Sequence, residues 1–183
     1  MRNQRGVTLV ELLIVMVILG ILVGVGVPAL RDLVLSNRQA AAVNELITAL
    51  QMARSHVVTR GEVWDVYNTG TNPNPTVAVC ASDDGLNCGG AWQDGWIIFR
   101  DPGGDGQPDA VDGGVLRAFE GHDGLNIGAD GVTLVRFRRD GRIAAPADFT
   151  FCDSRGDSYA RLLSIDFTGR PSVQKAPAGA CGG

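Results

Sequence analysis

An apolar run of 24 residues, Val7 to Leu30, constrains this chain more than any other stretch of its sequence. About 20 apolar residues are enough for a helix to cross the hydrocarbon core of a bilayer. Glu11 is the only charged residue in the run, and a carboxylate near the centre of a bilayer costs roughly 2.5–3.5 kcal/mol. An acid at this position therefore needs a partner charge or a special task.

Six residues precede the run, and they form a short basic leader with Arg2 and Arg5. Positive residues beside a membrane helix stay in the cytoplasm, so the rest of the chain is expected outside it. A secretory signal peptide or a plain signal anchor is the alternative. Glu11 argues against that alternative, because the apolar part of a signal peptide is uncharged. No Ala-x-Ala-like cleavage site stands out after the run either.

The junction between leader and run resembles the prepilin signature of type IV pilins and pseudopilins, in Gly6-Val7-Thr8-Leu9-Val10-Glu11-Leu12-Leu13. In that family a membrane peptidase cuts after the glycine and methylates the new N-terminus. The resemblance implies cleavage between Gly6 and Val7 and N-methylation of Val7, where the family usually has Phe. Glu11 would then be a docking charge, because a buried carboxylate is tolerable beside the positive N-terminus of a neighbouring subunit.

The helical pattern continues beyond Pro28. Apolar residues recur at three- and four-residue intervals at Val43, Leu46, Ile47, Leu50, Ala53, Val57 and Val58. That spacing is one face of an amphipathic helix, and Gly61 is suited to end it. We predict one helix from about Thr8 to Arg60, kinked near Pro28 and the glycines before it. Residues 7–30 would form the transmembrane or filament-core part, and residues 31–60 the part packed on a head.

The remainder, residues 61–183, changes to short runs rich in β-branched and aromatic residues, punctuated by Gly, Asn, Asp and Pro. Such runs predict antiparallel hairpins. The expected strands are Val63–Tyr67, Thr76–Cys80, Gly95–Phe99, Val115–Phe119, Val132–Phe137 and Arg161–Phe167. The fold class is therefore α+β and pilin-like, with a long N-terminal helix packed on an antiparallel β-sheet head.

Four cysteines form a close pair and a wider pair along the chain, Cys80 with Cys88 and Cys152 with Cys181. Zinc ligands usually come as Cys pairs separated by two to four residues. Neither pair has that spacing, and His56 and His122 are isolated, so both histidines are expected to be structural. An exported chain with an even cysteine count favours two disulfides. Of the three possible connectivities we favour the sequential one.

The segment from Cys80 to Phe99 resembles the GspH/FimT group of minor pseudopilins, in which a similar Cys…Cys…Trp-x-x-Gly-Trp run leads into a core strand. Here the run ends in Trp92-Gln93-Asp94-Gly95-Trp96. The two tryptophans are expected to pack over a hairpin rather than to form a binding platform. With the N-terminal motif, the resemblance implies a minor pseudopilin.

Four carboxylates, Asp101, Asp105, Asp109 and Asp112, stand at positions 1, 5, 9 and 12 of a template like the calcium loop of an EF-hand. Gly106 occupies position 6 as the template requires. Position 3 is a glycine, position 12 is Asp where a bidentate Glu is expected, and no helices flank the loop. The pattern predicts weak calcium binding at most, and a solvated acidic loop is the alternative.

Arginines gather in the C-terminal third of the chain. Arg136, Arg138, Arg139 and Arg142 lie around the Asp140-Gly141 turn, and Arg170 follows later. Arginines on a hairpin can line up phosphates, and some members of the resembled family bind DNA through a C-terminal Gly-Arg-x-Arg element. Here Gly169-Arg170-Pro171-Ser172 lacks the second Arg, and the net charge of −4 gives no general affinity for nucleic acid. A solvated strand face with local ion pairs is the alternative.

Catalytic motifs are not found: the sequence has no Gly-rich phosphate loop and no Gly-x-Ser-x-Gly elbow. We predict no enzyme and no cofactor beyond weak calcium. The resemblance implies a single-pass inner-membrane subunit with a periplasmic head, processed by prepilin peptidase and assembled with other pilins or pseudopilins. Type II secretion and type IV pilus machines both fit. A DNA-binding minor pilin of DNA uptake is the second hypothesis, and a periplasmic calcium or ligand binder on an uncleaved anchor is the third.

Overall fold

A computed structural model describes residues 8–60, 76–101, 104–108 and 114–182. The chain divides into two compact units, residues 1–37 and 38–183. Helix α1, Leu9–Arg60, belongs to both units, because it begins in the first and ends in the second. We call residues 38–183 the head unit. The strand predicted at Val63–Tyr67 lies outside the described residues.

Helix α1 starts at a capping box. The Thr8 hydroxyl accepts a hydrogen bond from the Glu11 N–H at 3.3 Å, and the Glu11 carboxylate accepts one from the Thr8 N–H at 3.4 Å. These reciprocal bonds satisfy two N–H groups that the first helical turn leaves without partners. The helix continues without interruption through Pro28. The predicted single helix is therefore confirmed, and any kink at Pro28 leaves it unbroken.

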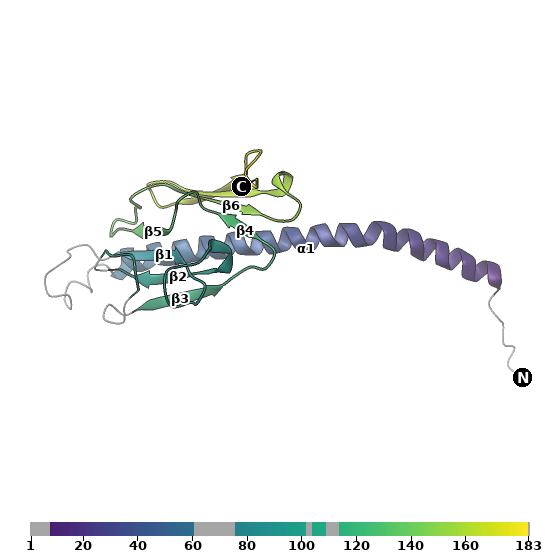
Figure 1. Ribbon diagram of the computed structural model, residues 1–183, viewed down its shortest axis with the longest axis horizontal. Coiled ribbons are helices and arrows are strands. Elements are labelled where there is room, and N and C mark those ends of the chain that lie inside the picture. Colours follow the sequence, from purple (N-terminus) through teal and green to yellow (C-terminus); the bar gives the residue numbers. More distant parts are fainter. Residues whose placement is uncertain (1–7, 61–75, 102–103, 109–113, 183) are drawn as a thin grey trace, which may run out of the picture. The chain divides into compact units, whose positions relative to one another are not determined.

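The head unit contains two antiparallel four-stranded sheets (Figure 1). The first has the order β3-β2-β1-β5 and is built from β1 Val77–Ala81, β2 Gly95–Arg100, β3 Val115–Glu120 and β5 Leu134–Phe137. The second has the order β4-β6-β7-β8 and is built from β4 Asn126–Gly128, β6 Ala147–Cys152, β7 Arg161–Ile165 and β8 Pro171–Lys175. Short 3-10 turns at Trp92–Asp94 and Asp157–Tyr159 precede β2 and β7.

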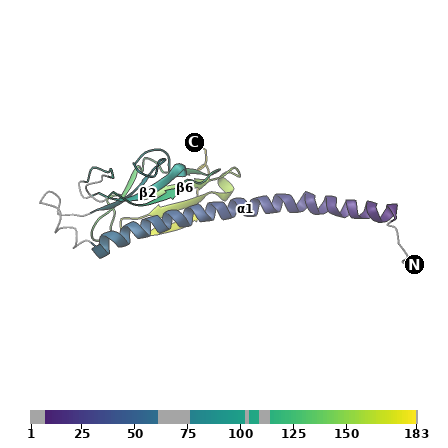
Figure 2. The same cartoon turned by 90° about the horizontal axis from the view of Figure 1, so that it is seen from below.

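One hydrophobic core joins both sheets to the second half of α1, which runs along them in Figure 2. The helix contributes Ala42, Val43, Leu46, Ala49, Leu50, Ala53 and Val57. The predicted apolar face is thus confirmed, except that Ile47 is half-buried and Val58 is exposed. Every member of this core lies at residue 42 or later. The head unit therefore carries its own core and has what it needs to fold without the apolar run.

The predicted α+β class is confirmed, but the head has two sheets where one was expected. Strands β4, β6 and β8 were not predicted. Strand β4 has three residues, and β8 begins with Pro171 and is almost wholly exposed, so neither has a clear alternation of apolar and polar residues. Strand β6 does alternate, with Ala147, Phe149 and Phe151 buried. The polar residues at its alternate positions, Asp148 and Thr150, make this strand weak as a sequence signal.

Both disulfides have the sequential connectivity, Cys80–Cys88 and Cys152–Cys181. The second disulfide ties the C-terminal tail to the end of β6. Asp157 holds the same tail, because its carboxylate accepts the N–H groups of Gly179 and Cys181, both at 2.8 Å. Beside it, hydrogen bonds from the Arg155 guanidinium hold the pKa of the Asp153 carboxyl below its ordinary value.

Loss of the wider disulfide should cost the most stability. The entropic model gives about 3.5 kcal/mol for the loop of Cys152–Cys181 and about 2.5 kcal/mol for the shorter loop of Cys80–Cys88. We expect Cys152→Ala/Cys181→Ala to lower the free energy of unfolding more than Cys80→Ala/Cys88→Ala does, as measured by urea denaturation of residues 31–183. Equal losses would mean that loop length does not set the difference.

Candidate assembly site

The first half of α1 presents an apolar surface with no protein covering it. From Leu9 to Leu30 its large apolar side chains are 50–79% exposed. Among the described residues, α1 is the one helix long and apolar enough to cross a membrane. Exposed apolar surface on this scale marks contact with lipid or with other protein. This half of α1 is the candidate assembly site.

Glu11 is the charged group of that surface, and its carboxylate lies at the start of α1. There it caps its own helix through Thr8 and faces the positive end of the helix dipole. A carboxylate has about four acceptor positions, so this single bond leaves room for an amine from a neighbouring chain. Gly6 and Val7 lie outside the described residues, and cleavage between them stays a prediction.

Both tryptophans of the Cys-Trp segment are buried, as predicted. Trp92 donates its indole N–H to the Val132 carbonyl at 2.8 Å and meets the Phe149 ring edge-on, with 4.7 Å between centroids. Trp96 is fully buried and stacks on Phe119. These side chains form core contacts, so no aromatic binding platform exists at this segment.

The histidines lie apart from each other. The ring of His122 stacks on Trp96, with 5.7 Å between centroids, and its Nε2 lies 2.7 Å from a carboxylate oxygen of Glu45. It therefore links the β3–β4 loop to α1, which is a structural role. His56 is half-buried on α1, close to the C-terminal end of the helix.

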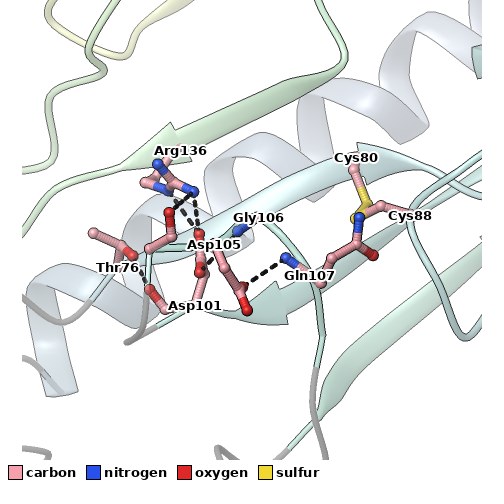
Figure 3. Close-up of polar contacts among 9 residues, drawn as sticks. Thr76, Cys80, Cys88, Asp101, Asp105, Gly106, Gln107 and Arg136 are labelled. Carbon is pink, nitrogen blue, oxygen red and sulfur yellow. Dashed lines mark hydrogen bonds and ion pairs between the residues drawn. A yellow bond between two sulfur atoms is a disulfide. The ribbon is translucent and has the colours of Figure 1, made fainter.

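Asp101 and Arg136 form a buried ion pair at the end of β2 (Figure 3). The Asp101 side chain is fully buried, and one carboxylate oxygen lies 2.7 Å from Nε and 2.5 Å from Nη2 of Arg136. The Gly106 N–H donates to the other carboxylate oxygen at 3.2 Å, and Arg136 also donates to the Gly104 carbonyl at 3.1 Å. The pair therefore fastens the loop after β2 onto β5.

This pairing bears on the calcium hypothesis. Asp101 is committed to Arg136, while Asp105 is exposed and accepts the Gln107 N–H at 3.0 Å. Asp109 and Asp112 lie outside the described residues. Over the described ranges, no three His, Cys, Asp or Glu side chains are grouped to hold a metal ion. Calcium binding stays a prediction, and it would require Asp101 to exchange its arginine for the ion.

Two glycine turns bring separate arginines together. The first turn, Arg138–Arg142, is closed by a hydrogen bond from the Gly141 N–H to the Arg138 carbonyl at 2.8 Å. The second, Asp166–Arg170, is closed by the Gly169 N–H donating to the Asp166 carbonyl at 2.9 Å. Both glycines have positive φ. A Cβ on Gly169 would collide with the Gly141 carbonyl, so the turns pack directly on each other.

Arg142 and Arg170 each follow one of these touching glycines, and both are exposed. Arg138 and Arg139 are exposed on the first turn, whereas Arg136, which lines the same hollow, is half-buried and paired with Asp101. Of the five arginines singled out in the sequence, four therefore share one end of the head. In the second turn, hydrogen bonds from the Thr168 hydroxyl and nearby N–H groups hold the pKa of the Asp166 carboxyl below its ordinary value.

Two of these features lie outside the predictions made from the sequence. The spacing Thr8-x-x-Glu11 is itself a capping-box signature and could have been recognised. The contact between Gly141 and Gly169 joins positions far apart in the chain, and local pattern gives no signal for it.

A helix that exposes its apolar half and packs its amphipathic half on an antiparallel head is the architecture of type IV pilin-like subunits. The family model of the type II transport protein GspH matches residues 42–169, and that of the prokaryotic N-terminal methylation motif matches residues 1–27. The chain belongs to the GspH family, as a minor pseudopilin of the GspH/FimT type. No curated protein matches it.

Two crystal structures of the type IV minor pilin FimU from Pseudomonas aeruginosa PAO1 share its fold, each at 22% sequence identity. One has a TM-score of 0.52 and covers 77% of this chain and 90% of FimU. The other has a TM-score of 0.53 and covers 76% and 97%. At this identity the similarity concerns the fold alone.

Proposed function

We propose that this protein is a structural subunit of a type II secretion pseudopilus or of a type IV pilus, assembled at its initiation or tip complex. The observation that carries the proposal is the exposed apolar half of α1 with a single carboxylate at its start. Before assembly, lipid covers this surface in the inner membrane. In the filament, the helices of other pilins or pseudopilins replace the lipid. This role requires no turnover of a substrate.

The rest of the chain supports export of the head to the periplasm. Arg2 and Arg5 precede the apolar run, and this favours a cytoplasmic N-terminus under the positive-inside rule. The two disulfides of the head form in an oxidising compartment. Single-pass insertion with a periplasmic head therefore satisfies both the charge pattern and the cysteine chemistry.

Processing should occur between Gly6 and Val7. We expect mass spectrometry of the mature protein to find Val7, carrying one methyl group, as its first residue. Replacing Gly6 with a bulkier residue, as in Gly6→Val, should leave the six-residue leader attached and keep the protein out of sheared filaments. A mature terminus near Gly26 would mean that the run is a secretory signal peptide.

DNA binding in uptake is a second candidate, favoured by the convergence of the two glycine turns. Four exposed arginines meet there, and the exposed ring of Phe167 lies in the second turn. Arginines neutralise phosphates and aromatic rings stack on bases. Asp140 and Asp166 lie in the same two turns, and their charges oppose the binding of a polyanion.

Residues 31–183 test this candidate in a salt series. If the candidate holds, DNA binding should appear at low salt and should weaken at least about tenfold on a fourfold rise in salt. Arg170→Ala should weaken it further, whereas Lys175→Ala, at an exposed cation on β8, should not. Absence of a mobility shift at low salt would exclude DNA as the partner.

A further inference from the structure

The chain that follows β8 packs on the outer face of the second sheet. Phe151 and Leu163 point into the main core, so their neighbours Cys152 and Leu162 point to the opposite face. There they form a separate apolar cluster with residues 176–182, which we call the tail. The cluster contains Cys152, Ala160, Leu162, Ala176, Ala180 and Cys181. The tail therefore covers apolar surface that the sheet alone would expose.

A short tether joins Cys181 to the second sheet. The Ala176 N–H donates to the Ala160 carbonyl at 3.0 Å, so the chain is anchored beside β7 at that point. Five residues later comes Cys181. A flexible chain of that length has a root-mean-square span of about 12 Å. In a tail held by this tether alone, the Cys181 sulfur would meet Cys152 in a minority of its conformations.

Asp157 restricts the tail further. Its two carboxylate oxygens accept separate N–H groups, Oδ2 from Gly179 and Oδ1 from Cys181, both at 2.8 Å. Hydrogen bonds to an ionised acceptor are roughly twice as strong as those between neutral groups. The second bond comes from the backbone of Cys181 itself, so it fixes the position from which that side chain reaches Cys152. Neither bond involves a sulfur atom, so both can form in the reduced chain.

The loop that presents Asp157 is held in place by contacts of its own. The fully buried Asp153 carboxylate pairs with Arg155, whose Nη2 lies 2.6 Å from Oδ2. The Arg155 guanidinium carbon lies 4.0 Å from the centroid of the Tyr159 ring. Asp157 starts the 3-10 turn between these residues, and its carbonyl accepts the Ala160 N–H at 3.1 Å. The carboxylate is therefore positioned without help from the tail.

We propose that Asp157 docks the reduced tail and thereby directs Cys181 to Cys152 as its disulfide partner. The reaction is thiol–disulfide exchange with an oxidant that carries a disulfide. Cys181 is half-buried and Cys152 is buried, so Cys181 is the more accessible thiol. Its thiolate attacks the oxidant, forms a mixed disulfide and expels one thiolate.

Docking by Asp157 then brings the mixed disulfide to Cys152. The Cys152 thiolate attacks the Cys181 sulfur and expels the second thiolate of the oxidant. Two thiols of this chain are thus oxidised, and one disulfide of the oxidant is reduced to two thiols, which take up the two protons. Asp157 is a positioning residue in this reaction, because it touches the backbone of Cys181 and neither sulfur.

The docked fraction of the reduced chain sets how strongly this disulfide is favoured. The effective concentration of Cys181 at Cys152 is its value in the docked state multiplied by that fraction. The pair Cys80–Cys88 has a sequence separation of 8 and closes locally, whereas Cys152 and Cys181 are separated by 29. A tail docked on the second sheet also keeps Cys181 away from Cys80, which lies on β1 of the first sheet.

Redox titration of the full chain in detergent micelles tests the proposal. The protein is equilibrated with reduced and oxidised glutathione at a series of ratios, free thiols are alkylated, and each disulfide is quantified by peptide mass spectrometry. Asp157→Ala should lower the effective concentration for Cys152–Cys181 at least about tenfold and leave that for Cys80–Cys88 unchanged. On reoxidation of the fully reduced chain, the same variant should give more disulfides between wrong partners.

Two further variants and one condition separate docking from general stability. Asp157→Asn retains one acceptor oxygen, so its loss of effective concentration should be intermediate. Ser158→Ala, at the next and exposed position of the same turn, should behave like the unmodified chain. In concentrated urea no tail is docked, so Asp157→Ala and the unmodified chain should have the same effective concentration.

Alkylation of Cys181 reports docking of the reduced tail directly. In Cys152→Ala the Cys181 thiol has lost its partner, and Asp157 can still hold the tail. Its reaction with iodoacetamide should be several times slower than in Cys152→Ala/Asp157→Ala, because a docked tail must open before the thiol is fully accessible.

Any of three results would overturn the proposal. The first is an unchanged effective concentration for Cys152–Cys181 in Asp157→Ala, and the second is an equal loss at both disulfides, which would mean that Asp157 acts through the stability of the whole head. The third is equal alkylation of Cys181 with and without Asp157. If Asp157→Ala does not fold, Asp157→Asn serves the same comparison, and no loss in that variant refutes the proposal.

Discussion

Glu11→Ala should remove this protein from the filament while leaving its head folded. If Glu11 pairs with the N-terminal amine of a neighbouring chain, the mutation leaves that amine buried without its counter-charge, which costs about 3–5 kcal/mol. Incorporation into sheared filaments should therefore fall at least about a hundredfold. The melting temperature of the head should not change, because Glu11 lies outside the head unit and its core.

Two further variants separate docking from capping. Glu11→Gln removes the charge but retains a side chain that can complete the capping box. Thr8→Ala removes the hydroxyl of the cap and retains the charge. We expect Glu11→Gln to fail like Glu11→Ala, and Thr8→Ala to assemble nearly as well as the unmodified protein. Normal assembly of Glu11→Gln would show that Glu11 is needed for its helix cap and not for docking.

The sequence predicted most of what is local in this fold. Helix α1 could be predicted because its first half is apolar throughout and its second half is amphipathic. Five strands, β1, β2, β3, β5 and β7, could be predicted from β-rich runs between turn residues. The disulfide pairing followed from cysteine count and spacing, and the burial of Trp92 and Trp96 followed from the expectation of a hairpin below them.

What the sequence did not predict depends on pairs of residues that are distant in the chain. The second sheet forms because β6 pairs with β4 on one side and with β7 on the other. Strand β4 has no clear alternation of apolar and polar residues that would predict it. The sequence groups Arg136 with the arginines of the next turn as candidate phosphate contacts, with local ion pairs as the alternative. The structure pairs Arg136 with Asp101, 35 residues earlier. The turns at Gly141 and Gly169 pack on each other although they belong to separate hairpins. No local periodicity predicts such contacts.

Loss of Arg136 from the Asp101–Arg136 pair should destabilise the head. Arg136→Met removes the guanidinium and leaves the Asp101 carboxylate fully buried. Among the described residues, this carboxylate then keeps its hydrogen bond from the Gly106 N–H. Breaking a buried pair from one side costs about 3–5 kcal/mol. We expect the free energy of unfolding of residues 31–183 to fall by that amount in urea denaturation. The neighbouring change Arg138→Met, at an exposed arginine, should cost less than about 0.5 kcal/mol.

The double variant Asp101→Asn/Arg136→Met shows why the pair matters. Once both charges are gone, no uncompensated carboxylate is buried, so much of the lost stability should return. If the double variant is as unstable as Arg136→Met, the arginine acts through packing and not through charge. The same variants test the calcium hypothesis, because Arg136→Met removes the arginine that pairs with Asp101 and leaves the carboxylate able to bind an ion. Stabilisation of Arg136→Met by millimolar calcium, absent in the double variant, would show that the acidic loop binds the ion once its arginine is gone.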